Sequence, residues 1–426
     1  MTVAAAPLPD FAPVRADPLA NSLLARWSIG LIAFLGAFVI NEPAPYELLL
    51  LVIMVLFLMF GMRLSGLALY LGILMIVFNI GGMLSMFTMP DYKEIPLYLA
   101  VSLFLGLSSV FWAAAIENNM GRLRVLMRGY VVGAAITSVL GIAGYFGAFP
   151  GAELFTLYDR AKGAFQDPNV FGPFLILPAL YLTYGLLYRS VTLAPVRMAF
   201  LLIILLGLFL SFSRGAWGGL AIAGVIFYAT LLMTEQSEHM RAKLILAGVL
   251  GIAALAGALI VALQFDAVYD MFEQRARVVQ EYDGAQLGRF ARHAIGFQWA
   301  LENPLGIGPL EFGQILGEDT HNIWVKALMA YGWLGFFAYL TLTACTLVGG
   351  ARLIGRIRPW QPYLLCIYAT YVGHIVLAWV IDVDHWRHVY LLIGLIWGCM
   401  ALEVNHQRRA AAVAAIPAKG MQSNAA

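Results

Sequence analysis

One polar stretch decides the fold: residues 264–322 read QFDAVYDMFEQRARVVQEYDGAQLGRFARHAIGFQWALENPLGIGPLEFGQILGEDTHN in a chain that is otherwise almost entirely apolar. Together with the residues as far as Tyr331, it is the only long polar segment of the sequence. The apolar runs before and after it have the composition of membrane helices. We therefore expect a helical bundle, with chemistry where this loop meets the membrane surface.

The composition of the whole chain indicates a membrane protein. Hydrophobic residues make up 62% and charged residues 12% of the chain, whereas a soluble domain has about 45–50% apolar and about 25% charged residues. Apolar runs of about 18 residues or more recur, and each can cross a bilayer core of about 30 Å. We predict an all-α, polytopic membrane protein. The alternating strands of about ten residues that a membrane β-barrel needs are not found.

Twelve apolar segments are candidate membrane spans: residues 23–41, 46–61, 64–87, 95–116, 125–149, 170–188, 197–212, 215–233, 243–263, 322–349, 361–381 and 388–404. The second and third spans, and the seventh and eighth, should form helical hairpins. We expect one transmembrane domain, residues 23–404, that includes a large loop at residues 264–321. A flexible cytoplasmic tail at residues 1–22 and a second cytoplasmic tail at residues 405–426 should flank it.

The positions of Lys and Arg orient the spans, because cytoplasmic connections are enriched in both. With the amino terminus inside, most basic residues fall in inner connections and tails. The outer exceptions are Lys93, Arg160, Lys162, Arg214, Arg387 and the arginines of the loop, Arg275, Arg277, Arg289 and Arg292. Even-numbered helices then start at the outer face, where their free N–H groups and partial positive charge favour an anion such as a diphosphate.

The first outer motif, Ser211-Phe212-Ser213-Arg214-Gly215-Ala216-Trp217, lies between two apolar runs with almost no spacer. A cation costs roughly 2.5–3.5 kcal/mol at the centre of a membrane and less near its surface. Arg214 is therefore either an interfacial arginine beside an aromatic residue or a ligand for phosphate oxygens, which suit the planar guanidinium.

The second outer motif is RAKGAFQDPNVFG at residues 160–172. Asp167 and Asn169 flank a proline, which is typical of a turn or a helix cap. Arg160 and Lys162 lie in an outer connection, where basic residues are not expected. Binding of a phosphate or glycan therefore remains an alternative to a purely structural turn.

Two motifs of the loop carry basic groups. Gly288-Arg289-Phe290-Ala291-Arg292-His293 begins an amphipathic stretch that runs to Leu301 and should form a helix on the membrane. Arg289 and Arg292 should share a face, and His293 should point elsewhere. The alternative is a solvated basic face.

Asp319-Thr320-His321-Asn322 should start the next helix, with Asp319 or Thr320 as its cap and His321 in the first turn. The positive helix end and the nearby arginines should keep His321 neutral, so that it can accept a proton. A histidine that merely lies at the interface is the alternative.

The last outer connection is Asp382-Val383-Asp384-His385-Trp386-Arg387-His388. Its acids and histidines could bind a metal, but their spacing does not match known metal motifs. We expect no metal and no cofactor, and we expect a sugar-binding or structural role with Trp386 as a stacking surface. His374 should be a packed histidine within its span. No P-loop, dinucleotide fingerprint or G-x-S-x-G is present, and a net charge of +2 gives no reason to expect nucleic acid.

Together these motifs resemble the O-antigen ligase and O-antigen polymerase superfamily of bacterial membrane proteins. The resemblance covers about residues 155–340. It rests on Phe165–Asn169, Ser213-Arg214-Gly215, Gly288-Arg289, Pro304-Leu305-Gly306-Ile307-Gly308, His321-Asn322 and the glycines Gly332 and Gly335. One departure is His293, where many relatives have Trp four residues after the arginine.

The resemblance implies a GT-C-like glycosyltransferase that works at the periplasmic face of a bacterial inner membrane. The reaction would be an inverting, metal-independent transfer of a glycan from undecaprenyl diphosphate to an acceptor sugar hydroxyl. By resemblance, His321 would deprotonate the acceptor while Arg214 and Arg289 would hold the diphosphate. Further candidates for substrate binding are Arg160, Lys162, Arg292, Asp167, Asn169, Asn322, Trp386 and Arg387.

Several functions remain open. A ligase would use lipid A-core as acceptor in lipopolysaccharide synthesis, a polymerase would extend a growing polysaccharide, and an oligosaccharyltransferase would modify protein. A transporter or lipid-linked glycan flippase would favour charges at mid-membrane and broken helices, whereas the distinctive charges here gather at one face. A membrane scaffold would leave the outer arginines and His321 unexplained.

Overall fold

The structure, a computed structural model, describes residues 23–91, 93–117, 119–275 and 288–414. Its helices are α1 (Leu23–Leu35), α2 (Pro45–Met59), α3 (Gly66–Met86), α4 (Ile95–Glu117), α5 (Gly121–Tyr145), α6 (Pro168–Phe174), α7 (Ile176–Tyr188), α8 (Ala194–Leu210), α9 (Arg214–Thr234), α10 (Glu238–Ala262), α11 (Asp266–Arg275), α13 (Arg289–Glu302), α14 (Glu311–Leu316), α15 (Ile323–Ile354), α16 (Gln361–Leu377) and α17 (Arg387–Ala414). Short 3-10 turns occur at Ala152–Phe155 and Val191–Leu193. β1 (Thr156–Leu157) pairs antiparallel with β2 (Arg160–Ala161), the only strand pair in the described residues.

The predicted all-α, multi-pass class is confirmed. Within the described residues, nine helices are long and apolar enough to cross a membrane, with α6 and α7 counted as one span. Helices also occupy the other predicted spans, but α1 and α2 are shorter, so the number of twelve stays a prediction. The proposed tail at residues 1–22 lies outside the described residues, as does Arg277, whereas α17 continues to Ala414.

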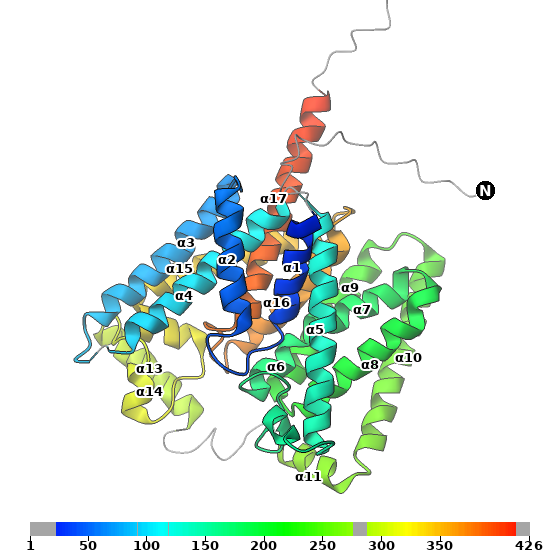
Figure 1. The fold of residues 1–426 in the computed structure, drawn as a ribbon, viewed down its shortest axis with the longest axis horizontal. Helices are drawn as coiled ribbons and strands as arrows, with labels where there is room; N and C mark the ends of the chain where they lie inside the picture. Colours follow the sequence, from blue (N-terminus) through cyan, green and yellow to red (C-terminus); the bar gives the residue numbers. More distant parts are fainter. Residues whose placement is uncertain (1–22, 92, 118, 276–287, 415–426) are drawn as a thin grey trace, which may run out of the picture.

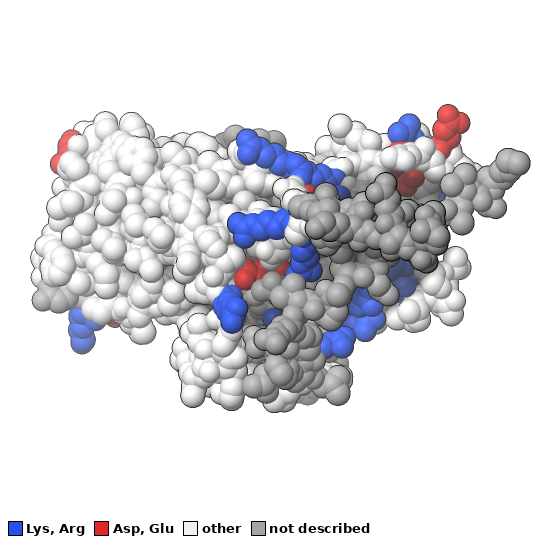
Figure 2. All heavy atoms as spheres, turned by 90° about the horizontal axis from the view of Figure 1, so that it is seen from above, with Lys and Arg blue, Asp and Glu red and all other residues white. Residues whose placement is uncertain are grey.

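The helix connections gather at two ends of the bundle (Figure 1). One end, which we call the loop end, carries α11, α13, α14 and the starts of α9, α15 and α17. The connections predicted to be cytoplasmic lie at the other end, which we call the opposite end. Figure 2 views this opposite end and shows Lys and Arg side chains gathered on it. Basic side chains are therefore present at the end where the cytoplasmic connections are predicted.

Small residues let the central helices approach closely. α3 packs along α15, and α4 along α17. A Cβ atom built on Gly81 of α3 would lie 2.3 Å from the carbonyl oxygen of Tyr331, and one on Gly394 of α17 would lie 2.4 Å from that of Ser109. Such contacts are typical of membrane helices, where close packing rather than hydrophobic burial drives association.

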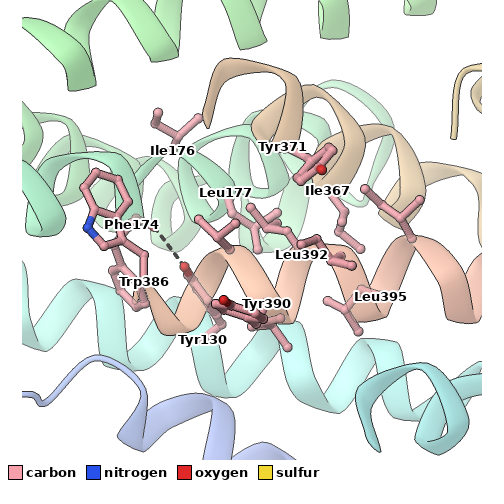
Figure 3. Close-up of a cluster of buried hydrophobic side chains, with 14 of the residues drawn as sticks. Tyr130, Phe174, Ile176, Leu177, Ile367, Tyr371, Trp386, Tyr390, Leu392 and Leu395 are labelled. Atoms are coloured by element: carbon pink, nitrogen blue, oxygen red, sulfur yellow. Dashed lines mark hydrogen bonds between the residues drawn. The ribbon is translucent and has the colours of Figure 1, made fainter. Parts of the chain in front are cut away.

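The core beside the loop end combines aromatic and aliphatic side chains. Figure 3 shows Tyr130 of α5 donating a hydrogen bond to the carbonyl oxygen of Phe174, at 3.1 Å. Trp386 and Tyr390 lie in the same cluster. Because α5, α6, α16 and α17 meet here, this core fixes the position of the connection between α16 and α17 at the loop end.

Candidate active site at the loop end

His321 lies in a turn just before α15, with a φ of 51° in the left-handed region. Asn322 is the N-cap: its side-chain oxygen accepts hydrogen bonds from the N–H groups of Trp324 (3.0 Å) and Val325 (3.3 Å). The prediction that Asp319 or Thr320 caps the helix, with His321 in its first turn, is therefore wrong. Asn322 satisfies the free N–H groups instead, and the imidazole remains outside the helix with its side chain 35% exposed.

Asp382, from the connection between α16 and α17, faces His321. The distance from Nδ1 of His321 to Oδ2 of Asp382 is 3.9 Å, and the Asp382 side chain is only 12% exposed. The two connections are tied together because the N–H of Ile323 donates to the carbonyl oxygen of Ala378 at 3.0 Å. The ring and the carboxylate are thus placed to form an ion pair when His321 takes up a proton.

The surroundings of His321 favour its neutral form. Burial lowers the pKa of His321, and the positive charge of Arg289 lowers it further. The acids Glu318 and Asp319 oppose this shift without reversing it. His321 is therefore neutral at pH 7 and can act as a proton acceptor. Sequence reasoning anticipated the effect of the arginines but not the larger effect of burial.

Lys326, in the first turns of α15, links the acids around the site. Its Nζ lies 2.9 Å from Oδ2 of Asp319, 3.5 Å from Oδ1 of Asp384 and 3.8 Å from Oδ2 of Asp382. Sequence reasoning missed Lys326, although a lysine within an apolar span is itself a signal of function. In the described part of the chain, no group of three or more His, Cys, Asp or Glu is arranged to hold a metal ion.

The acids of the last connection differ in their partners. Asp384 accepts a hydrogen bond from Tyr98 at 2.7 Å and lies 3.0 Å from Nδ1 of His385. Burial alone would raise the pKa of Asp384, but Lys326 and His385 hold it below its usual range. For Asp382, burial is the largest effect and raises the pKa to about 7. Asp384 is thus a fixed anion, whereas Asp382 titrates near neutral pH.

Helix α13 holds the turn that carries His321. Arg292 is buried and pairs with Glu318 of the turn. His293, which we expected to point elsewhere, is close enough to the backbone of Thr320 and His321 for both to affect its pKa. That prediction is wrong because the turn lies along α13, so that the neighbouring residues Arg292 and His293 both face it. Burial lowers the pKa of His293, and its Nε2 is buried without a hydrogen-bond partner.

The glycine-rich segment after α13 is anchored to α15. The carbonyl oxygen of Met329 accepts from the N–H of Ile307 at 2.8 Å, and that of Pro304 accepts from the N–H of Trp333 at 3.0 Å. α15 is kinked at Gly332, where φ is 63° and ψ is −176°. A Cβ at Gly332 would lie 2.6 Å from the carbonyl oxygen of Leu305. This contact fixes α13 and its basic residues relative to α15.

The motif of residues 160–172 supports the start of α9. Arg160 is buried and donates through Nε to the carbonyl oxygen of Ser211 at 2.7 Å and through a terminal nitrogen to Oδ1 of Asn169 at 2.8 Å. Asp167 caps α6 by accepting from the N–H of Asn169 at 2.6 Å. Arg160 therefore holds the turn before Arg214, while Asp167 and Asn169 shape the start of α6, which agrees with the structural alternative for this motif.

Arg214 begins α9 at the loop end, and Ser213 is the N-cap of this helix. A Cβ on the next residue, Gly215, would lie 2.3 Å from Cδ1 of Leu377, at the end of α16. The starts of α9 and α15 thus converge on the end of α16. Lys162 is half-buried after β2, where its N–H donates to the carbonyl oxygen of Phe155 at 3.0 Å.

Trp386 and Arg387 of the last connection face the helical bundle. Arg387 pairs with Glu47 of α2 and with Glu42 at 2.9 Å. Trp386 is buried in the core of Figure 3, so it does not offer the exposed stacking surface that we expected. Its neighbours His374 and His388 contact each other through Nε2, at 3.1 Å, and His374 is packed as expected.

These features define a multi-pass membrane protein with a polar site at one end of its bundle. Residues 199–340, a third of the chain, match the model of a family described as O-antigen ligase. This match confirms the predicted resemblance to the O-antigen ligase superfamily and supports a function of the ligase or polymerase type. The matched region includes Arg214, Arg289 and His321. No curated protein matches the chain.

Proposed function

We propose that the protein transfers a glycan from undecaprenyl diphosphate to an acceptor sugar hydroxyl, at the periplasmic face of a bacterial inner membrane. The observation that carries this proposal is the environment of His321: a partly exposed, neutral imidazole with a carboxylate 3.9 Å from its Nδ1. Arg289 is near enough to lower the pKa of His321, so a cationic group and a base serve the same site.

In the proposed reaction, Nε2 of His321 takes the proton of the acceptor hydroxyl, while Asp382 faces Nδ1 and stabilises the imidazolium. The acceptor oxygen forms a bond to the anomeric carbon with inversion. The bond from that carbon to the diphosphate oxygen breaks, and the diphosphate leaves with the electron pair. Arg289 and Arg214, together with the start of α9, offset the charge that develops on the diphosphate. No step calls for a metal or cofactor.

We further propose that the acceptor is lipid A-core, as the family description favours, and that polymerisation of a surface polysaccharide is the alternative. The cluster of Lys326 with Asp319, Asp382 and Asp384 lies at the loop end, which supports an enzyme over a flippase, because a flippase would favour charges along a path through the bilayer.

The test replaces His321 with Ala and, separately, Arg289 with Ala in a deletion strain. Protein amounts are measured by blot, surface glycan by gel, and lipid-linked donor by extraction. Loss of surface glycan with accumulation of donor is the expected result. Bare lipid A-core with long lipid-linked chains in the deletion strain would indicate a ligase, whereas single repeat units on lipid A-core would indicate a polymerase.

The matched control is His239→Ala, which removes a histidine at the opposite end, in the first turn of α10. It should leave the glycan profile unchanged. Normal glycan in both the His321 and Arg289 variants would contradict the proposed catalytic centre.

A further inference from the structure

The proposed reaction does not use the buried ammonium group of Lys326, which lies among three carboxylates of the site. We propose that Lys326 is a positioning residue that keeps Asp382 ionised and aimed at His321, and that it thereby sets the pH range of the transfer. This inference rests on the proposed function. It assigns a role to a residue that neither takes a proton from the acceptor nor binds the leaving group.

The geometry places Lys326 between the turn of His321 and the last connection. Its side chain is 9% exposed, and its Nζ lies within 4 Å of carboxylate oxygens of Asp319, Asp382 and Asp384. Its N–H donates to the carbonyl oxygen of Asn322 at 2.8 Å. The side chain of Lys326 therefore extends from the start of α15 into a cluster of three carboxylates, to which it supplies one positive charge.

Asp382 depends on Lys326 more than the other acids do. Asp384 has Tyr98 and His385 as further partners, and Asp319 accepts from the N–H of Thr320 at 3.0 Å. Oδ1 of Asp382 is buried without a hydrogen-bond partner, whereas its Oδ2 lies 3.8 Å from Lys326 and 3.9 Å from His321. Apart from a hydrogen bond from the backbone of Asn322, the ammonium is its main support.

The balance of charge around Asp382 fixes the sign of the effect. Lys326 favours the ionised carboxylate, whereas burial, Asp319 and Asp384 oppose it. Among the described residues, the titratable and charged groups that face this site include Lys326 and Tyr331 of α15, Glu318, Asp319 and His321 of the turn, Asp384 and His385 of the last connection, Tyr98 of α4, and Arg289, Arg292 and His293 of α13. Without Lys326, the pKa of Asp382 therefore rises.

A protonated Asp382 cannot stabilise the imidazolium that forms when His321 accepts the acceptor proton. Removal of the ammonium should therefore lower kcat at neutral pH. At higher pH, where Asp382 is ionised again, kcat should recover. A lysine that only held α15 against the last connection would behave differently, because its loss would lower activity at every pH in proportion.

The experiment measures transfer by the purified full-length chain in lipid nanodiscs, with an undecaprenyl-diphosphate-linked O-antigen repeat and lipid A-core. Rates are recorded between about pH 5.5 and 9 for the wild type, Lys326→Met, Lys326→Arg, Asp382→Asn and the double variant Lys326→Met/Asp382→Asn. Thermal unfolding reports whether each variant is folded.

We expect Lys326→Met to shift the acidic limb of the kcat–pH profile to higher pH, by about one pH unit or more. The KM for the donor should change little. Lys326→Arg should keep the limb in place. In the Asp382→Asn background, the lysine substitution should produce no further shift, since the group through which it acts is gone.

An unchanged limb in a folded Lys326→Met protein would overturn the inference, and so would an equal shift with and without Asp382. If Lys326→Met does not fold, the limb of Lys326→Gln decides by the same criterion. Failure of the proposed function is distinct, because wild-type protein would then fail to transfer glycan or His321→Ala would retain full activity.

Discussion

Nδ1 of His321 lies 3.9 Å from Oδ2 of Asp382, although the two residues belong to different connections of the loop end. The distance is longer than a hydrogen bond and within the range of an ion pair. Hydrogen bonds at catalytic sites often tighten only when substrate is bound. The pair is therefore arranged so that proton transfer to His321 creates the interaction that stabilises it.

Asp382→Asn should reduce transfer by a smaller factor than His321→Ala, for which the loss of a general base predicts about 10²–10⁴-fold. The amide preserves the shape of the side chain but removes the charge that faces the imidazolium. The measurement is kcat with purified protein and a fixed donor. A variant as active as the wild type would show that the carboxylate has no part in the reaction.

The same substitution should change the pH profile. Burial raises the pKa of Asp382 to about 7, so the wild-type rate should fall as the pH drops through neutrality. In Asp382→Asn, the remaining limb belongs to His321, whose pKa is lowered from its ordinary value by burial and Arg289. The limb should therefore move to a lower pH. A profile that stays at its wild-type position would assign the limb to another group.

Asp382 should also cost stability at alkaline pH. Its pKa is raised in the folded state, so the folded chain binds more protons than the unfolded chain between pH 3.8 and about 7. Folded stability is therefore lost as the pH rises through that window. Asp382→Asn should raise Tm at pH 8 and leave it nearly unchanged at acidic pH. An equal change in Tm at both pH values would contradict this linkage.

His293→Ala should lower kcat without unfolding the protein, because the ring supports the backbone of the turn that carries His321. The loss should be roughly tenfold, in line with the sensitivity of catalysis to small displacements. His293→Gln retains a donor and should recover part of the rate. Full activity in His293→Ala would indicate that α13 holds the turn through Arg292 and Glu318 alone.

The sequence predicted those parts of the molecule that depend on local chemistry. Apolar length predicted the spans, and alternation of basic residues predicted which connections share an end. His321 was proposed as a base because histidine is the side chain whose charge changes near neutral pH, and this role stays a prediction.

Pairing across the chain could not be predicted in the same way. Asp382 and His321 meet through contacts between distant parts of the chain, among them the bond from the N–H of Ile323 to Ala378, and no local pattern encodes such contacts. Likewise, Arg160 was a candidate ligand because it is a basic residue in an outer connection. Its guanidinium, however, donates hydrogen bonds to Ser211 and Asn169. The cap at Asn322 was missed because Asp319, Thr320 and Asn322 are all good caps, and tertiary contacts select among them.

Gly306→Ala should destabilise the protein more than Gly61→Ala does. Both glycines have positive φ, 85° and 87°, so each substitution carries a backbone penalty of roughly 1–3 kcal/mol. At Gly306, however, the added Cβ would lie 2.5 Å from Oγ of Ser85 and 2.6 Å from the carbonyl oxygen of Met329, whereas at Gly61 nothing lies within 4 Å. The extra crowding should displace the segment that fixes α13 on α15, lowering both Tm and glycan transfer in Gly306→Ala. Gly61→Ala, at the opposite end, should lower Tm alone. Equal losses of transfer in the two variants would mean that the segment does not position the site.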